Sequence, residues 1–269
     1  AGVLNAVGGT STLEGIRMGG AFTSSAPALT AAGSAIVTLR PGNVTNYAAG
    51  ATGGSFGAGT LIVVRGTAHL IVDGGSFDGP GVGGLGVSAG GGGAIEVFDD
   101  AHLTLTGVTL RVNTRGITLR GRANLTMSSC TLEASAVASS AWGILVFNGV
   151  GETATATVTD STIRAFAYGG ISASIMVSDL SGGNQPRGSF VLTNTTLAQS
   201  SLGVYVDVYS SATIEGNGLQ IRDNLFGGVR VEGALGLTMT GGAVTGNAWY
   251  TNTAISAFYG GISLGATRA

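Results

Sequence analysis

The stretch RGITLRGRANLTMSSCTL, residues 115–132, decides the fold, because apolar and polar residues alternate along it without any helical period. Alternation with period two is typical of a β-strand that has one face in the core. Gly121 and Ser129 interrupt the pattern with residues that favour turns. The stretch therefore predicts short strands joined by bends. The side chains that we expect to point inward are Ile117, Leu119, Leu125, Met127 and Leu132.

Two phrases of this stretch recur along the chain. The first, GITL at 116–119, returns as GIRM at 15–18, AIEV at 94–97, GILV at 143–146, GISA at 170–173, GVYV at 203–206, GVRV at 228–231 and AISA at 254–257. The second, LTMSSCTL at 125–132, returns as LIVDGGSF at 70–77, LTLTGVTL at 103–110, ATVTDSTI at 156–163, FVLTNTTL at 190–197, ATIEGNGL at 212–219 and LTMTGGAV at 237–244, with a weaker copy, VTLRPGNV, at 37–44. The offset between the two phrases is constant in four repeats: 94 to 103, 116 to 125, 203 to 212 and 228 to 237.

The second phrase carries its own bend. A residue that tolerates a left-handed backbone stands there in each copy: Gly74, Gly107, Ser129, Asp160, Asn194, Gly216 and Gly241. An apolar residue three positions later returns the chain to the core: Phe77, Leu110, Leu132, Ile163, Leu197, Leu219 and Val244. Three short strands in each period of about 22 residues, with no helical segment, predict an all-β fold in which stacked coils pair strand by strand.

The repeated pattern of these two phrases and the bend resembles that of right-handed parallel β-helix proteins of the pectin-lyase-like superfamily, over about residues 15–260. The resemblance implies a single solenoid of about eight coils with variable loops, closest in style to non-catalytic surface and passenger members. We therefore expect one domain over 1–269: an irregular lead-in at 1–14, coils at 15–260, and an incomplete last coil or tail at 261–269. The superfamily also holds polysaccharide lyases, glycosidases and esterases, so the fold alone leaves the function open.

Composition excludes several classes of partner. Charged residues make up 10% of the chain, the net charge is -2, and all 12 basic residues are arginine. This balance predicts no binding to nucleic acid. No apolar run is long enough to cross a bilayer, so we expect no membrane insertion. Cys130 is the only cysteine, which rules out an internal disulfide. Because the chain begins at Ala1, we expect it to be a mature or excised piece of a longer protein.

The glycosidase branch of the resembled superfamily carries acids around the Gly-Ile strand, in a pattern like Asn-Thr-Asp-Gly-Ile-Asp. The matching stretch here is NTRGIT at 113–118, in which Arg115 and Thr118 stand where that pattern has acids. Hydrolysis of a glycosidic bond by acid–base catalysis needs two carboxyl groups. The sequence therefore predicts that this chemistry is absent from the stretch.

One pair of acids remains as a catalytic candidate. Asp207 and Glu232 follow the Gly-Val strands of successive coils, with Tyr205 and Arg230 beside them. Stacked one coil apart, the carboxyls would lie about 5 Å from each other, a separation suited to a retaining glycosidase. The alternative interpretation is a solvated pair bridged by Arg230. In the same outward rows we expect Ser172 and Ser174, taken from the GISA copy.

Other residues are candidates for binding. Outward aromatic and basic side chains that could contact a glycan are Phe98, Phe147, Tyr205 and Arg120. Asp99 and Asp100 could hold Ca²⁺, although pairing with Arg120 and Arg122 is the simpler interpretation, and no other cofactor is expected. His69 and His102 occupy the same repeat position, which favours a structural role over catalysis.

One face should carry rows of threonine, at Thr104, Thr106, Thr126, Thr157, Thr159, Thr238 and Thr240, interrupted by Ile71, Val191 and Glu215. Such rows resemble those of ice-binding solenoids. Neither terminus shows an amphipathic capping helix, so end-to-end or lateral self-association is expected. The sequence favours an extracellular or cell-surface structural protein: a stalk, adhesin, passenger or fibre subunit. The alternatives are a lyase or hydrolase of an acidic polysaccharide and a glycan- or ice-binding module.

Overall fold

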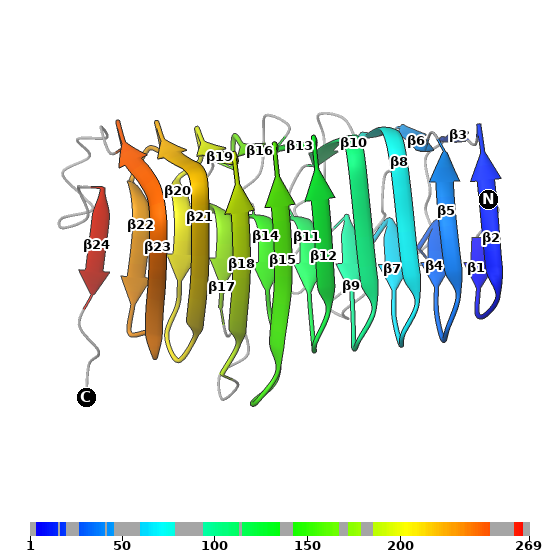
Figure 1. The fold of residues 1–269 in the computed structure, drawn as a ribbon, viewed down its shortest axis with the longest axis horizontal. Coiled ribbons are helices and arrows are strands. Elements are labelled where there is room, and N and C mark those ends of the chain that lie inside the picture. Colours follow the sequence, from blue (N-terminus) through cyan, green and yellow to red (C-terminus); the bar gives the residue numbers. More distant parts are fainter. Residues whose placement is uncertain are drawn as a thin grey trace.

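The computed structural model describes residues 4–15, 17–19, 27–40, 42–45, 60–78, 94–112, 115–134, 142–166, 172–178, 185–247 and 261–265. Every regular element in these ranges is a β-strand, and every strand pairing is parallel. The strands form two sheets that run side by side along the long axis of the molecule (Figure 1). The expected all-β, parallel architecture is therefore confirmed.

The ten-stranded sheet holds the first phrase of the repeats from AIEV at 94–97 onward, preceded by three strands that are not copies of this phrase. Its strands are, in spatial order, β1 (Leu4–Ala6), β4 (Leu29–Ala31), β7 (Ile62–Val64), β9 (Ile95–Val97), β11 (Arg115–Leu119), β14 (Trp142–Val146), β17 (Ala173–Val177), β20 (Leu202–Val206), β22 (Gly227–Glu232) and β24 (Ile262–Gly265). Spatial order follows chain order, so each strand lies beside its counterpart from the repeat before and the repeat after. The assignment of GIRM at 15–18 to the first phrase was wrong, because Arg17–Gly19 pairs with Asn43–Thr45 in the other sheet.

The fourteen-stranded sheet is built from the second phrase and bends where that phrase turns. Its strands are β2 (Thr10–Glu14), β3 (Arg17–Gly19), β5 (Ile36–Arg40), β6 (Gly42–Thr45), β8 (His69–Asp78), β10 (His102–Val112), β12 (Asn124–Ser128), β13 (Thr131–Ala134), β15 (Thr153–Thr159), β16 (Thr162–Arg164), β18 (Arg187–Thr193), β19 (Thr196–Ala198), β21 (Ser211–Arg222) and β23 (Gly236–Thr245). The long strand β10 pairs with β12 before the bend and with β13 after it.

Register follows the sequence repeat. Leu103 aligns with Leu70 on one side and with Leu125 on the other, and Leu110 aligns with Phe77 and Leu132. Residues that share a position in the repeat therefore share a row in the structure, and the apolar rows meet between the two sheets. All five side chains expected to point inward are buried, with exposures of 0–2% (Ile117, Leu119, Leu125, Met127 and Leu132).

The bends need a left-handed backbone, as expected. Ser129, Asp160 and Asn194 have φ between 47° and 53°, and Gly74, Gly107 and Gly241 are also positive. The prediction was wrong for Gly216, because the left-handed residue of that repeat is Gly218. Strand β21 is bulged between Gly216 and Gln220, so that Ile221, and not Leu219, aligns with Leu197.

Three other expectations are corrected. The lead-in at 1–14 is not irregular, since β1 and β2 lie within it and pair with β4 and β5. The strand expected at GISA is Ala173–Val177, because Ile175 and Val177 supply the two inward apolar positions. Met176 and Ser178 therefore stand in the outward rows where Ser172 and Ser174 were expected. AISA at 254–257 lies outside the described residues, and residues 262–264 pair with Val229–Val231 instead.

Candidate functional site

The acidic pair expected from the sequence meets at one tyrosine. Tyr205 and Arg230 are aligned neighbours on β20 and β22, and Asp207 and Glu232 lie two positions further along the chain. The Tyr205 hydroxyl lies 2.9 Å from Asp207 Oδ1 and 3.1 Å from Glu232 Oε2. One phenol therefore contacts both carboxylates, so the structure brings together all four residues of this catalytic candidate.

The carboxylates of Asp207 and Glu232 also accept hydrogen bonds from other groups. Asp207 Oδ1 also accepts the backbone N–H of Val208 at 2.7 Å, and Asp207 Oδ2 accepts the Ser178 hydroxyl at 2.5 Å. Glu232 Oε2 accepts Arg230 at 2.6 Å. The two acids are partly exposed, as expected for a solvated pair, with 40% of the Glu232 side chain exposed. Their partners are buried more deeply than expected, since Tyr205 is 1% exposed and the Arg230 side chain 18%. The cluster lies partly buried in the outer surface of the sheet.

Burial and charge keep the phenol protonated. Desolvation is the largest cause of the raised pKa of Tyr205, and the neighbouring Asp207 and Glu232 raise that pKa further. Tyr205 is thus a hydrogen-bond donor at all ordinary pH values and is unsuited to act as a general base. The arrangement stabilises two adjacent carboxylates; a catalytic acid or base would also need an oxygen directed at a substrate.

The candidate binding residues on the middle strands pack against one another. The Arg120 guanidinium lies 5.4 Å from the centre of the Phe98 ring and 4.7 Å from that of Phe147. Burial lowers the pKa of Arg120, and Glu96 opposes that shift. A cation between two aromatic rings is a stabilising contact. Phe147 is 8% exposed, so the ring expected to face a glycan is instead covered.

Phe147 belongs to a second apolar cluster on the outer face of the ten-stranded sheet. It is formed by Trp142, Leu145, Phe147, Ala173, Met176, Leu202 and Tyr205, with Phe226 packed against it. Sequence reasoning missed it by treating outward positions as exposed. Strands that read apolar at both alternating positions, such as WGILV, are typical of sheets buried on both faces.

The two acids proposed for Ca²⁺ have other partners. Asp100 forms a two-point ion pair with Arg122, at 2.7 and 2.6 Å, and hydrogen bonds from Arg122 lower the pKa of Asp100. Asp99 Oδ2 accepts the N–H of Gly66 at 2.9 Å. The pairing interpretation with Arg122 is confirmed. In the described part of the chain, no group of three or more His, Cys, Asp or Glu side chains could hold a metal ion.

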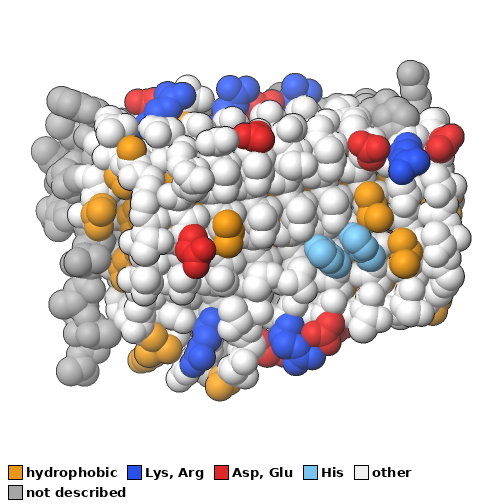
Figure 2. Space-filling model, viewed as in Figure 1, with side chains coloured by type: hydrophobic (Ala, Val, Ile, Leu, Met, Phe, Trp, Pro, Cys, Tyr) orange, Lys and Arg blue, Asp and Glu red, His pale blue; other side chains and the backbone are white. Residues whose placement is uncertain are grey.

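The histidines form a stacked pair on the fourteen-stranded sheet. The rings of His69 and His102 are 4.6 Å apart and nearly parallel. Their Nε2 atoms lie 2.9 Å from Thr104 Oγ1 and 3.2 Å from Thr126 Oγ1. The pair is visible in pale blue on the face drawn in Figure 2. Ring stacking and hydrogen bonding along the repeat agree with a structural role.

The histidine pair predicts a pH dependence of stability. Burial lowers the pKa of both imidazoles, and the neighbouring His102 lowers that of His69 further. The unfolded chain then binds protons more readily than the folded chain around the ordinary pKa of about 6.5. We expect the free energy of unfolding to fall as the pH drops from about 7.5 to 5. Urea unfolding of the wild type and of a His69→Asn/His102→Asn variant would test this, because Asn124 occupies the next position of the same row. Equal pH slopes for the two proteins would contradict it.

The face that carries the histidines is rich in hydroxyl groups. Thr104, Thr126 and Thr157 align on three successive strands. Ile71, Val191 and Glu215 interrupt the row at the aligned positions, as the sequence predicted. Figure 2 shows that charged side chains lie mainly along the two edges of this face. Ice binding by these rows stays a prediction.

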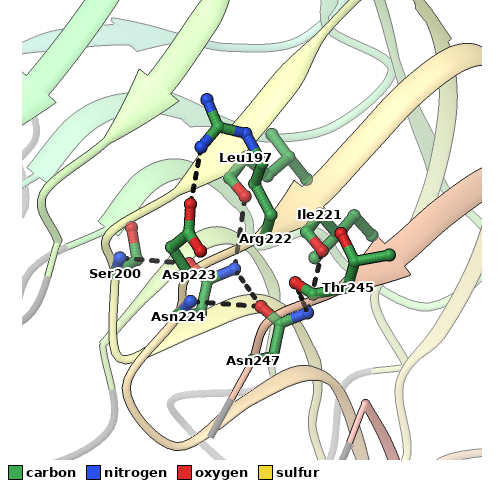
Figure 3. A network of polar contacts seen from close by, with 8 residues as sticks. All are labelled: Leu197, Ser200, Ile221, Arg222, Asp223, Asn224, Thr245 and Asn247. Atoms are coloured by element: carbon green, nitrogen blue, oxygen red, sulfur yellow. Dashed lines mark hydrogen bonds and ion pairs between the residues drawn. The ribbon is translucent and has the colours of Figure 1, made fainter.

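A corner of polar side chains was missed entirely. Ser200 N–H donates to Asn224 Oδ1 at 3.0 Å, and Asn224 N–H donates to Asn247 Oδ1 at 3.1 Å (Figure 3). Asn224 Nδ2 also donates to Leu197 O, and Asn247 Nδ2 donates to Ile221 O. Each side chain thus satisfies the backbone of the preceding repeat. The sequence holds a clue, since Ser200, Asn224 and Asn247 each follow an inward apolar residue by three positions.

Buried Cys130 fills the bend. It is 4% exposed, and its N–H donates to Ser161 Oγ at 3.0 Å. Burial raises the pKa of its thiol, so the thiol is held in its unreactive protonated form.

Comparison with known proteins adds no relative. No family model, no curated protein and no solved structure matches this chain. No helix in the described ranges is long and apolar enough to cross a membrane. The class of the protein is therefore given by the fold alone: an all-β protein with parallel strands in two sheets.

Proposed function

We propose that this chain is a single right-handed parallel β-helix of the pectin-lyase-like type. We further propose that it serves as an extracellular or cell-surface structural protein: a stalk, adhesin, passenger or fibre subunit. The regular register supports the fold, because Leu70, Leu103 and Leu125 occupy one row on successive repeats. Connections between parallel strands are right-handed in nearly all proteins, which supports the hand.

The observation that carries the structural role is the state of the two ends. Inward side chains in the middle of the stack are 0–2% exposed, as for Leu103 and Leu125. At the first repeat, Leu4 and Leu13 are only partly buried, and at the last repeat Leu237 and Met239 are only partly buried. A stack whose core rows are open at both ends is suited to continue, through more coils or through another subunit.

Head-to-tail association tests this role. Ser11 is exposed on β2 but aligns with buried Val37, so it stands in an inward row. A Ser11→Lys variant would place a charge where the next subunit must pack, whereas Thr12→Lys on the outward side of the same strand would not. We expect the wild-type particle to lengthen with concentration in X-ray scattering, Ser11→Lys to abolish the growth, and Thr12→Lys to retain it. Wild-type particles that keep one length at all concentrations would contradict self-association.

The enzyme alternative is tested at the acidic cluster. Because Tyr205, Ser178 and Arg230 hold Asp207 and Glu232, we expect no activity to depend on these acids. Asp207→Asn with Glu232→Gln should lose at most about 1–3 kcal/mol of stability and no biological function. Depolymerisation of polygalacturonate by the wild type, lost in the double variant, would show instead that the cluster is catalytic.

A further inference from the structure

Two neighbouring turns at the C-terminal end present an apolar patch. After β20, Val208 and Tyr209 are 38% and 56% exposed, and after β22, Leu235 is 54% exposed. The turns are joined by backbone hydrogen bonds, Tyr209 N–H to Gly233 O at 3.1 Å and Leu235 N–H to Ser210 O at 2.8 Å. These three side chains, which we call the turn patch, therefore lie on adjacent repeats at the end of the strands that carry the acidic cluster.

Tyr209 is held in a conformation that does not suit it. Its φ is 58°, in the left-handed region. The corresponding turns of other repeats have a residue with little or no side-chain bulk in that region: glycine at Gly33, Gly66, Gly121 and Gly233, and aspartate at Asp99. A bulky side chain there is strained, and such strain tends to persist where the residue serves a function.

The chemistry around the patch points to a carbohydrate. We propose that the turn patch binds a neutral polysaccharide, with the Tyr209 ring stacked on a sugar and Leu235 and Val208 packed beside it. Three side chains are too few for a stable protein interface, which needs about 800 Å² from each partner. Asp207 and Glu232 directly precede the two turns that carry the patch, and their oxygens are held by Tyr205, Ser178 and Arg230. The negative charge of these two acids disfavours uronic-acid polymers.

This binding deepens the adhesin role and rests on the proposed function. The test is electrophoresis of the whole chain through native gels that contain hydroxyethyl cellulose, a neutral β-glucan, or polygalacturonate. We expect retardation by the neutral polymer only. Tyr209→Gly should weaken it about tenfold, the effect of about 1.4 kcal/mol. Leu235→Ala should weaken it less. Val150→Ala, which alters an equally exposed side chain in another turn, should leave it unchanged.

Thermal melting separates binding from a structural role. Because Tyr209→Gly removes strain, we expect the variant to melt at the same temperature as the wild type or higher while it loses retardation. A lower melting temperature would show that the ring supports the fold and would overturn the proposal. Absence of retardation in the neutral gel, or equal retardation by polygalacturonate, would also overturn it. If the protein still self-associates but is not retarded by the neutral polymer, only the proposal of polysaccharide binding is refuted. If the protein is retarded but its particle length does not change with concentration, only the proposed fibre role is refuted.

Discussion

Leu125→Asp is expected to unfold the protein. Leu125 is 2% exposed and lies in the inward row between Leu103 and Ala156. Loss of a buried leucine side chain costs about 2–5 kcal/mol. Burial of an unpaired carboxylate adds several kcal/mol more. The sum is comparable with the whole stability of a typical domain, about 5–15 kcal/mol. Circular dichroism and size-exclusion chromatography should show lost β-structure or aggregation.

The matched control is the same change on the outer face. Thr157 is exposed and lies directly after Ala156, which shares the row of Leu125. Thr157→Asp should change stability by no more than about 0.5 kcal/mol. A soluble Leu125→Asp protein with the wild-type spectrum and a cooperative melt would show that the alternating pattern does not place this residue in the core.

The fold was predictable because the repeat constrains it many times over. A one-residue slip in strand pairing would turn every inward leucine of the row to solvent. Rows such as Leu70, Leu103 and Leu125 are therefore compatible with only one pairing register. Errors arose where a repeat departs from the common length. Leu219 lies in the core as expected, but the bulge in β21 after Gly216 aligns Ile221 with Leu197 and moves the left-handed residue to Gly218; no composition rule marks such an insertion.

The sequence predicted which residues meet at the candidate site but did not predict how deeply they are buried. Register alone placed Asp207 beside Glu232 and Tyr205 beside Arg230. It could not show that Tyr205 is buried, because alternation identifies the outer face of a sheet but not what covers that face. The exposed ring of this region is Tyr209, four positions further on. The left-handed backbone of Tyr209 depends on local turn geometry, and the residue pair Val208-Tyr209 contains none of the residue types that usually indicate such a turn.

The Asn224 corner carries the second large effect. Asn224 is 1% exposed, accepts the N–H of Ser200 at 3.0 Å and donates to Leu197 O at 3.2 Å. Asn224→Ala would leave that buried N–H and carbonyl without these partners. Each unsatisfied buried group costs about 1–3 kcal/mol, so we expect a loss of about 3–4 kcal/mol. Urea unfolding would measure it.

Two comparisons make that prediction specific to the hydrogen bonds. Asn224→Ser should recover part of the loss, because Ser200 performs the same task one repeat earlier by accepting the N–H of Phe166. Asn217→Ala, at an exposed position of the strand that precedes this corner, β21, should cost less than about 0.5 kcal/mol. Equal destabilisation by Asn224→Ala and Asn217→Ala would mean that the corner adds nothing to the stability of the stack. A loss confined to Asn224→Ala would mean that side-chain amides, and not apolar rows alone, hold successive repeats in register at this corner.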